Sequence, residues 1–274
     1  SVALAGNPNT GKTSLFNALT GSNQRVGNWP GVTVDLVEGA FRDDAGEIRV
    51  VDLPGTYSLG AASPDERVAT EFLLSRSADL VTIVIDASNL ERSLYLAVQI
   101  LELDIPALLV VNMGDLAVSR GMDVDLDALS RRIGAPVVST LARGGCARCS
   151  SRGACVGCMS PRCLPQGDGV DSLKRAMRSA GVLQRSPIRM AYGADIERAV
   201  SRLETALASA PRAAVDSFGG TRMLALRMAE RDPIAMDRIS EFSRDGEAGR
   251  ILAEEDALLT ERFGYGLDTA TIER

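Results

Sequence analysis

Short apolar stretches alternate with longer amphipathic ones over about the first 180 residues of the chain. Short apolar runs bounded by turn residues are typical of buried strands, and apolar positions spaced three and four apart indicate helices. Their alternation predicts an α/β domain with a mostly parallel sheet and helices on both faces. The predicted strands are Val2–Ala5, Val34–Phe41, Glu47–Asp52, Leu80–Asp86, Pro106–Asn112 and Pro136–Ser139.

Three helices are predicted between these strands, and two of them carry end signals. Ser63 is placed to cap a helix over Pro64–Ser75, whose proline suits the first helical position. Gly134 is placed to end a helix over Leu126–Ile133. The third helix covers Leu90–Leu103.

The pattern changes after Ile188, because Ala, Glu, Arg and Leu recur at helical spacing and no convincing strand follows. We therefore expect a first domain over residues 1–183 and a smaller all-helical domain over residues 184–274. The helical domain includes Asp195–Leu203 and Thr221–Ala229. A cysteine-rich insert at about residues 144–168 interrupts the first domain.

Composition narrows the classes of function. The 274-residue chain has 30 Lys and Arg against 36 Asp and Glu, so its net charge of −6 offers nucleic acid no overall basic field. Histidine is absent, which leaves carboxylates, hydroxyls or the substrate itself as general bases. The longest apolar runs fall short of the ~20 residues of a membrane-spanning helix. Because Ser1 leads directly into a predicted core strand, we expect a fragment of a longer protein.

The sequence GNPNTGKT, from Gly6 to Thr13, follows the first predicted strand and leads into a helix-like stretch. That order is the setting of a phosphate-binding loop, whose backbone N–H groups surround phosphate oxygens. Lys12 supplies a cation for the β- and γ-phosphates, and the Thr13 hydroxyl is placed to bind Mg²⁺. The nucleotide-binding residues assigned to this loop are Asn7, Pro8, Asn9, Thr10, Gly11, Lys12, Thr13 and Ser14.

The sequence NMGD, at residues 112–115, indicates which base is bound. The Asp115 carboxylate can accept hydrogen bonds from the two N–H groups that guanine offers and adenine lacks, while Asn112 braces the loop. Met113 stands where the usual pattern N-K-x-D has lysine, and an ordinary turn at a strand end is the alternative. The last base-contacting segment is assigned to Ser139, Thr140, Leu141 and Ala142, with Leu141 where serine is common.

Two further segments are predicted to respond to the γ-phosphate. Asp52 is placed to hold Mg²⁺ through water, and the Gly55 N–H to bond the γ-phosphate. Thr56 stands where a water-orienting glutamine is common, so we expect slow hydrolysis. Upstream, Thr33 is the candidate hydroxyl that completes the Mg²⁺ shell in the triphosphate state. Trp29, the only tryptophan, either anchors this loop or acts at the nucleotide.

All five cysteines fall between Cys146 and Cys163. They include two C-x₂-C pairs, Cys146 with Cys149 and Cys155 with Cys158. Such pairs suit a tetrathiolate site for zinc or an iron–sulfur cluster. A redox-sensing dithiol and a surface loop with free thiols are the alternatives.

At four segments the chain resembles the cytosolic G domain of the ferrous iron transport protein B (FeoB) family. The resemblance is carried by GNPNTGKTSLFNALTG from Gly6, VGNWPGVTVD from Val26, DLPGTYSL from Asp52 and NMGD from Asn112. The second of these is more diagnostic than the general GTPase motifs. The resemblance implies a Ras-like P-loop GTPase fold, and the region after Ile188 is similar to the family's helical domain, described as resembling a nucleotide-dissociation inhibitor.

The resemblance also implies a function and its ligands. It implies a slow, K⁺-stimulated GTPase on the cytoplasmic face of the bacterial inner membrane, attached to the membrane-spanning remainder of an Fe²⁺ transporter. The ligands are GTP or GDP, Mg²⁺ and K⁺, with K⁺ held by Asn9 and by backbone carbonyls near Gly27 and Trp29. Small Feo accessory proteins and a second copy of the chain are implied as partners. The residues expected to carry catalysis are Lys12, Thr33, Gly55 and Asn9.

Two other functions fit some of the motifs. Soluble GTPases of ribosome assembly or tRNA modification also carry an Asn-Pro-Asn phosphate loop, but the acidic balance and the lack of a basic extension argue against them. A metal- or redox-sensing module with vestigial nucleotide binding would instead make the cysteine-rich segment the functional site.

Overall fold

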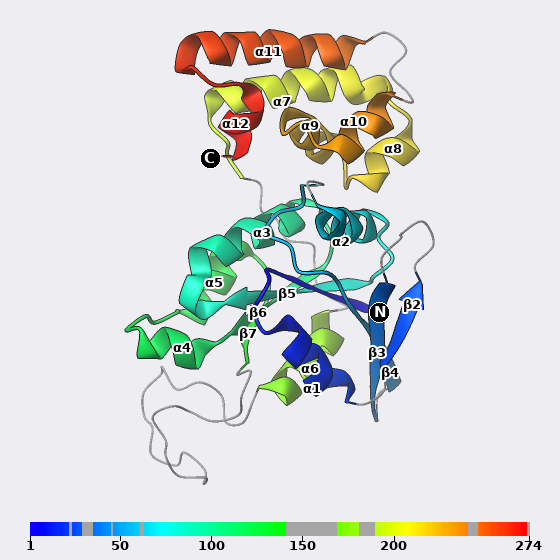
Figure 1. The fold of residues 1–274 in the computed structure, drawn as a ribbon, viewed down its shortest axis with the longest axis vertical. Coiled ribbons are helices and arrows are strands. Elements are labelled where there is room, and N and C mark those ends of the chain that lie inside the picture. The colour runs from blue at the N-terminus through cyan, green and yellow to red at the C-terminus, as the bar shows by residue number, and fades with distance from the viewer. Residues whose placement is uncertain are drawn as a thin grey trace. The chain divides into compact units, whose positions relative to one another are not determined.

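Figure 1 shows the computed structural model, which describes residues 1–21, 24–28, 35–44, 46–60, 63–140, 169–180, 190–240 and 246–272. The chain forms two compact units that divide near residue 188. The first contains a sheet covered by helices. The described residues of the second form helices and no strand.

The described part of the first unit contains a seven-stranded sheet. Its strands are β1 (Val2–Gly6), β2 (Gln24–Asn28), β3 (Asp35–Asp43), β4 (Gly46–Asp52), β5 (Leu80–Asp86), β6 (Ala107–Asn112) and β7 (Val137–Ser139). Their order is β2-β3-β4-β1-β5-β6-β7. The five strands from β4 to β7 in this order are parallel, and β3 runs antiparallel to both β2 and β4. The predicted mostly parallel sheet is therefore confirmed.

Helices cover both faces of this sheet (Figure 1). The helices α1 (Lys12–Thr20) and α6 (Val170–Ala180) lie on one face, and α2 (Pro64–Leu74) and α3 (Leu90–Glu102) lie on the other. Two shorter helices, α4 (Gly114–Ser119) and α5 (Leu126–Ile133), follow β6. The end signals act as predicted, because the Ser63 side chain accepts a hydrogen bond from the Glu66 N–H at 3.2 Å and Gly134 ends α5 at φ 64°.

The sequence-based prediction lacks several of these elements, among them strand β2 and helix α6 of the first unit. Strand β2 is an edge strand with the sequence QRVGN, and its pairing with β3 rather than an apolar pattern makes it a strand. Helix α6 follows the cysteine-rich segment. Its Val170, Leu173 and Met177 recur at helical spacing and are buried against the sheet.

In the described residues, the core between the sheet and the α1/α6 layer is mostly apolar. Its buried members include Val2, Leu4, Leu15, Phe16, Leu19, Phe41, Val50, Leu80, Val84, Leu108, Val110, Leu173 and Met177. Alternate residues of a strand share a face, so Thr82 lies in this layer between Leu80 and Val84. Its hydroxyl is buried and has no hydrogen-bond partner among the described residues. A threonine here therefore carries an unsatisfied polar group in the core.

The second unit is built around the packing of α7 (Ala194–Ala206) on α9 (Thr221–Ala229) and on α11 (Glu247–Phe263). Charged side chains join two of these helices, because the buried Glu255 carboxylate accepts hydrogen bonds from Arg198 and Arg202. These contacts raise the pKa of both arginines. The remaining described elements are a 3₁₀ turn (Leu207–Ser209), α8 (Arg212–Ser217), α10 (Pro233–Ser240) and α12 (Leu267–Ile272).

A second charged contact links α7 to α9. The Glu197 carboxylate accepts two hydrogen bonds from Arg222, at 2.8 and 2.9 Å. These bonds hold the pKa of Glu197 below its ordinary value, against the opposing effect of burial.

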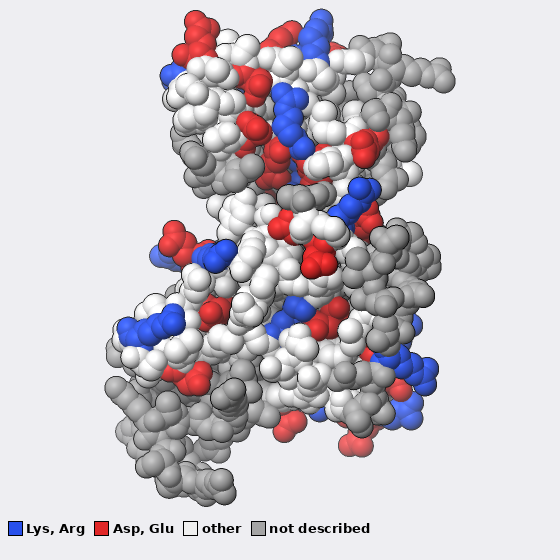
Figure 2. Space-filling model, in the orientation of Figure 1, with Lys and Arg blue, Asp and Glu red and all other residues white. Residues whose placement is uncertain are grey.

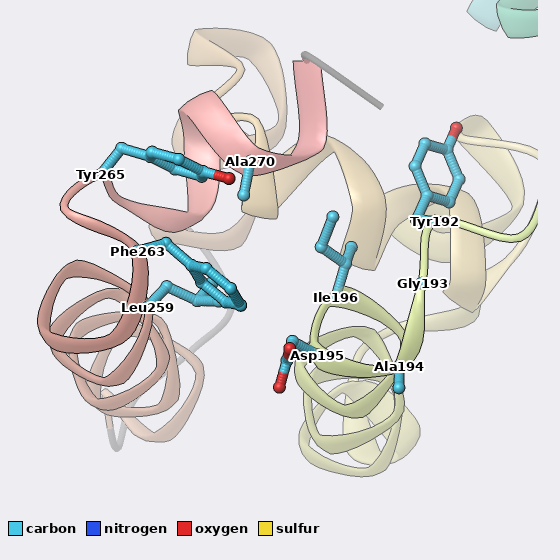
Figure 3. A pocket seen from close by; sticks show the side chains of 9 residues that line it. All are labelled: Tyr192, Gly193, Ala194, Asp195, Ile196, Leu259, Phe263, Tyr265 and Ala270. Atoms are coloured by element: carbon cyan, nitrogen blue, oxygen red, sulfur yellow. The ribbon is translucent and has the colours of Figure 1, made fainter.

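The helical unit also contains a pocket of about 80 Å³ between the start of α7 and the α11–α12 turn (Figure 3). Phe263 and Tyr265 stack on one side with ring centroids 6.0 Å apart, and Tyr192 lies on the other. The Asp195 carboxylate at its edge is already engaged by Arg198 and Arg262. Ligand pockets usually measure about 300–1,000 Å³, so this one is too small for a nucleotide.

On the face shown in Figure 2, acidic and basic side chains are interspersed on both units. Within the described residues, none of the helices has the length and apolar character needed to cross a bilayer.

Candidate nucleotide-binding site

Residues assigned to nucleotide binding gather where the parallel strands end. Asn7 follows β1, Asp52 ends β4, Asn112 ends β6 and Ser139 ends β7. Neighbouring parallel strands place their carboxyl ends at the same edge, where ligands of such sheets bind. The fold therefore brings these four positions together at one edge of the sheet.

The phosphate-binding loop runs from β1 into α1 through two left-handed residues, Asn9 at φ 66° and Gly11 at φ 82°. The Thr10 hydroxyl donates to the Asn7 carbonyl at 2.9 Å, and Thr10 is almost fully buried. Gly6 lies so close to β5 that a Cβ atom would sit 2.5 Å from the Val84 carbonyl oxygen. Glycine is thus required there for close approach, and the loop is closed by its own hydrogen bonds.

Lys12 lies at the centre of the phosphate end. Its ammonium group donates to the Asp52 carboxylate and to the Leu53 carbonyl. The Lys12 and Asp52 side chains are each only 8% exposed. The positive charge of Lys12 is therefore paired with the negative charge of the carboxylate at the end of β4.

The same carboxylate accepts a hydrogen bond from the Thr13 hydroxyl at 3.2 Å. A hydroxyl and a carboxylate oxygen converging at the mouth of a phosphate loop are the hard oxygen donors that Mg²⁺ prefers. Thr13 and Asp52 therefore fit the predicted magnesium site. Thr33, the third residue assigned to Mg²⁺, lies outside the described residues.

The segment after β4 packs directly on the phosphate loop. A Cβ atom on Gly55 would lie 3.2 Å from Pro8 Cα, and the Thr56 N–H donates to the Gly6 carbonyl at 3.3 Å. Thr56 is buried, and its hydroxyl donates to the Ser58 carbonyl. The residue that replaces the usual glutamine is thus occupied within its own turn.

Asn112 connects the base end to the phosphate end. It is fully buried, its side-chain N–H donates to the Thr10 carbonyl at 2.8 Å, and its amide oxygen accepts from the Thr140 hydroxyl at 3.2 Å. Met113 adopts a left-handed φ of 58°, which directs the chain into α4. Asp115 lies in the first turn of α4, half-buried, and no described residue bonds its carboxylate.

The two asparagines of the loop differ in placement. Asn7 is buried, and its side-chain N–H donates to the Arg92 carbonyl of α3 at 3.2 Å, while its amide oxygen has no partner in the described part of the chain. Asn9 is exposed, and its side chain has no bonding partner within the described ranges. Asn7 therefore anchors the loop to α3, and Asn9 is the asparagine accessible to a ligand.

Several assigned residues lie outside the described ranges. Gly27 is described, in β2 opposite Leu36. The residues of interest that the structure does not describe are Trp29, Thr33, Leu141, Ala142, Cys146, Cys149, Cys155, Cys158 and Cys163.

Helix α3 contributes contacts that carry no sequence signal. The Arg92 guanidinium lies 3.8 Å above the ring of Tyr57, and Gln99 accepts a hydrogen bond from the Leu59 N–H at 2.9 Å. These side chains hold the segment after Gly55 against α3. A polar residue on an amphipathic helix has no feature that would reveal such a partner.

Comparisons with known proteins identify relatives over the first unit. The family model described as "Ferrous iron transport protein B" matches residues 1–148. The Fe(2+) transporter FeoB of Escherichia coli strain K12 is 53% identical over 150 residues, covering 52% of this chain and 19% of the relative. The FeoB transporter of Salmonella typhimurium strain LT2 gives the same figures. The matched half of this chain thus covers about a fifth of the length of these curated relatives.

Solved structures resemble the whole chain. The cytosolic domain of L. pneumophila FeoB has a TM-score of 0.76 at 31% identity, covering 99% of this chain and 93% of that one. The cytosolic domain of T. maritima FeoB in its GMPPNP form has a TM-score of 0.73 at 33% identity, covering 99% and 95%. A GDP-bound mutant of S. thermophilus NFeoB has a TM-score of 0.75 at 33% identity, covering 100% and 97%.

These similarities agree with the geometry of the site. The strand, loop and helix at Gly6–Thr13, the carboxylate at the end of β4 and the NMGD turn after β6 together form a P-loop GTPase fold. Because the family model also matches 148 of the 274 residues, the chain belongs to the ferrous iron transport protein B family.

Proposed function

We propose that this chain binds and hydrolyses GTP as the cytosolic regulatory domain of a ferrous iron transporter. The main support is the hydrogen bond from Asn112 to the Thr10 carbonyl, because it ties a guanine-type motif to a phosphate loop. Asp115, unbonded by the described residues, supplies acceptors for the N–H groups of guanine. Structures of relatives in GMPPNP and GDP forms add to this support.

At the phosphate end, Lys12 exchanges the Asp52 carboxylate for the β- and γ-phosphate oxygens when nucleotide binds. The Thr13 hydroxyl and the Asp52 carboxylate oxygen lie 3.2 Å apart, and Thr13, Thr33 and, through water, Asp52 would hold Mg²⁺. When bound there, Mg²⁺ offsets the negative charge of the phosphates. The Gly55 N–H bonds the γ-phosphate, and this bond signals the triphosphate state to the segment that follows.

Hydrolysis proceeds by attack of water on the γ-phosphorus, forming a new P–O bond and breaking the bond to the bridging oxygen of GDP. The proposed acceptor of the water proton is a γ-phosphate oxygen, because histidine is absent and the Thr56 hydroxyl already donates to the Ser58 carbonyl. Because Thr56 stands where a water-orienting glutamine is common, the intrinsic reaction is slow.

Asn9 is the proposed ligand of an activating K⁺ ion. Its exposure and its lack of a bonding partner in the described residues leave its amide oxygen accessible beside the phosphates. Backbone carbonyls near Gly27 and Trp29 complete the set. A monovalent cation there offsets charge that develops on the phosphates, as an arginine finger does elsewhere.

The remaining proposals rest on the sequence and on the relatives. The cysteines Cys146, Cys149, Cys155 and Cys158 form a site for zinc or an iron–sulfur cluster. Residues 1–183 and 184–274 are the GTP-binding and helical domains. The relatives are about three times as long as this chain, so this chain is attached to a membrane-spanning remainder at the cytoplasmic face of the inner membrane. A second copy and small Feo proteins are partners.

Phosphate release from GTP and from ATP, each measured in KCl and in NaCl, tests this proposal. We expect turnover with GTP only, faster in KCl, and abolished by Lys12→Ala. Asn9→Ala should remove the difference between KCl and NaCl while preserving GDP binding. Equal turnover of ATP, or no turnover of GTP in either salt, would contradict the proposed function.

A further inference from the structure

Gly169 makes an unusually close backbone contact at the base end of the site. It precedes α6, its carbonyl accepts from the Leu173 N–H at 2.9 Å, and its φ is 77°. A Cβ atom there would collide with the Ser139 carbonyl oxygen and lie 3.0 Å from Thr140 Cα. The end of β7 and the start of α6 therefore touch backbone to backbone.

The contacted residues belong to the network that joins base and phosphate ends. The Thr140 N–H donates to the Val111 carbonyl at 2.9 Å, and its hydroxyl donates to the buried Asn112 amide oxygen at 3.2 Å. Asn112 in turn donates to the Thr10 carbonyl. A shift of Thr140 would thus alter the position of Asn112, which braces the guanine-recognition turn.

Helix α6 is held more firmly than the strand end. It packs on β5, β6 and β7, and its Leu173 and Met177 are buried in the core. Strand β7 is three residues long and, among the described strands, pairs with β6 alone. A side chain at position 169 would therefore displace Ser139 and Thr140 rather than the helix.

We propose that Gly169 is a positioning residue for guanine-nucleotide affinity, acting through Thr140 and Asn112. This inference rests on the proposed function. Because Gly169 contacts the base end of the site, it sets the Kd of GDP and the KM of GTP. It leaves the chemical step at the γ-phosphate unchanged. A glycine needed only for its left-handed backbone would have no such selective effect.

The test compares Gly169→Ala with Gly121→Ala. Gly121 has almost the same φ, 75°, but nothing lies within 4 Å of its Cβ position, so its variant carries the backbone strain without the collision. We expect Gly169→Ala to raise the Kd of GDP and the KM of GTP about three- to tenfold, as loss of one hydrogen bond would. Its kcat at saturating GTP should stay within about twofold of the wild type, and Gly121→Ala should change neither quantity.

Thr140 variants test the route of the effect. Thr140→Val removes the hydroxyl and should raise KM like Gly169→Ala, whereas Thr140→Ser keeps the hydroxyl and should restore the wild-type KM. The double variant Gly169→Ala with Thr140→Val should raise KM less than the product of the two single effects. If Gly169→Ala does not fold, Gly169→Asn takes its place, because asparagine tolerates a left-handed φ and carries the same Cβ.

Several results would overturn the inference. One is an equal KM in Gly169→Ala and Gly121→Ala, and another is a fall in kcat at unchanged KM, which indicates loss of folded protein. Independent effects of Gly169→Ala and Thr140→Val would exclude the proposed route. A wild-type protein that fails to bind GDP would remove the proposed function, and this inference with it.

Discussion

The ion pair between Lys12 and Asp52 makes a quantitative prediction about the nucleotide-free protein. Asp52→Asn keeps the shape of the side chain and removes its charge, leaving Lys12 with the Leu53 carbonyl and an amide oxygen. Both side chains are 8% exposed, so the pair is close to fully buried. Removing one partner of a buried pair costs about 3–5 kcal/mol. Because Lys12 keeps polar neighbours, we expect the lower end, about 3 kcal/mol.

Urea unfolding at pH 7, without nucleotide or Mg²⁺, measures this loss. The matched control is Glu47→Gln, also on β4, whose pair with Arg42 joins side chains that are 47% and 76% exposed. Exposed pairs contribute little, so the control should cost at most about 0.5 kcal/mol. Lys12→Met should also destabilise, and the double variant should lose about 1–3 kcal/mol less than the sum of the single losses.

A cost for Asp52→Asn no larger than that for Glu47→Gln would refute the reasoning, since it would mean that Lys12 does not depend on the carboxylate. Strict additivity of the Lys12 and Asp52 variants would refute it as well, because a direct pair must couple.

Three further predictions concern other parts of the molecule. Thr82→Val should raise the unfolding free energy by about 1 kcal/mol because it removes an unpaired buried hydroxyl, whereas Thr70→Val, which breaks a 3.1 Å hydrogen bond to a backbone carbonyl, should lower it by a similar amount. Arg222 holds the pKa of Glu197 below its ordinary 4.5, so the ion pair stabilises the folded state fully above pH 4.5 and loses this effect as the pH falls through the lowered pKa. The difference in unfolding free energy between wild type and Glu197→Gln should therefore shrink from pH 7 to pH 3. Gly55→Ala would bring a Cβ to 3.2 Å of the phosphate loop and should lower kcat for GTP at least about tenfold, with GDP affinity nearly unchanged.

Each of these has a contradicting result. A destabilising Thr82→Val would mean that the hydroxyl has a partner. A constant difference between wild type and Glu197→Gln across the pH range would mean that Arg222 does not bond the carboxylate in solution. An unchanged kcat in Gly55→Ala would separate this turn from the γ-phosphate.

Local signals made the fold predictable. Strand β5 has the predicted bounds, Leu80–Asp86, because an apolar run that is interrupted by Thr82 alone and lies between turn residues allows little else. The cap at Ser63 and the stop at Gly134 also follow from local chemistry. The edge strand β2 does not, because its polar sequence becomes a strand only through pairing with β3.

The candidate site also has parts that local sequence predicts and parts that depend on tertiary packing. The strand, loop and helix around Lys12 are contiguous in sequence, so their arrangement could be predicted. The bond from Asn7 to the Arg92 carbonyl spans 85 positions, and the contact of Gly169 with Ser139 depends on where α6 packs. Such contacts arise from tertiary packing, and nothing in the neighbouring sequence indicates them.

The identity of the base is the central claim, and Asp115→Asn tests it most directly. Asparagine replaces a carboxylate acceptor with an N–H donor, which suits the second carbonyl of xanthine and repels the amine of guanine. Calorimetric titration of the wild type should give tight binding of GDP and none of ADP or xanthosine diphosphate, and Asp115→Asn should bind xanthosine diphosphate in place of GDP. Equal binding of GDP and ADP by the wild type, or unchanged GDP affinity in Asp115→Asn, would contradict the account.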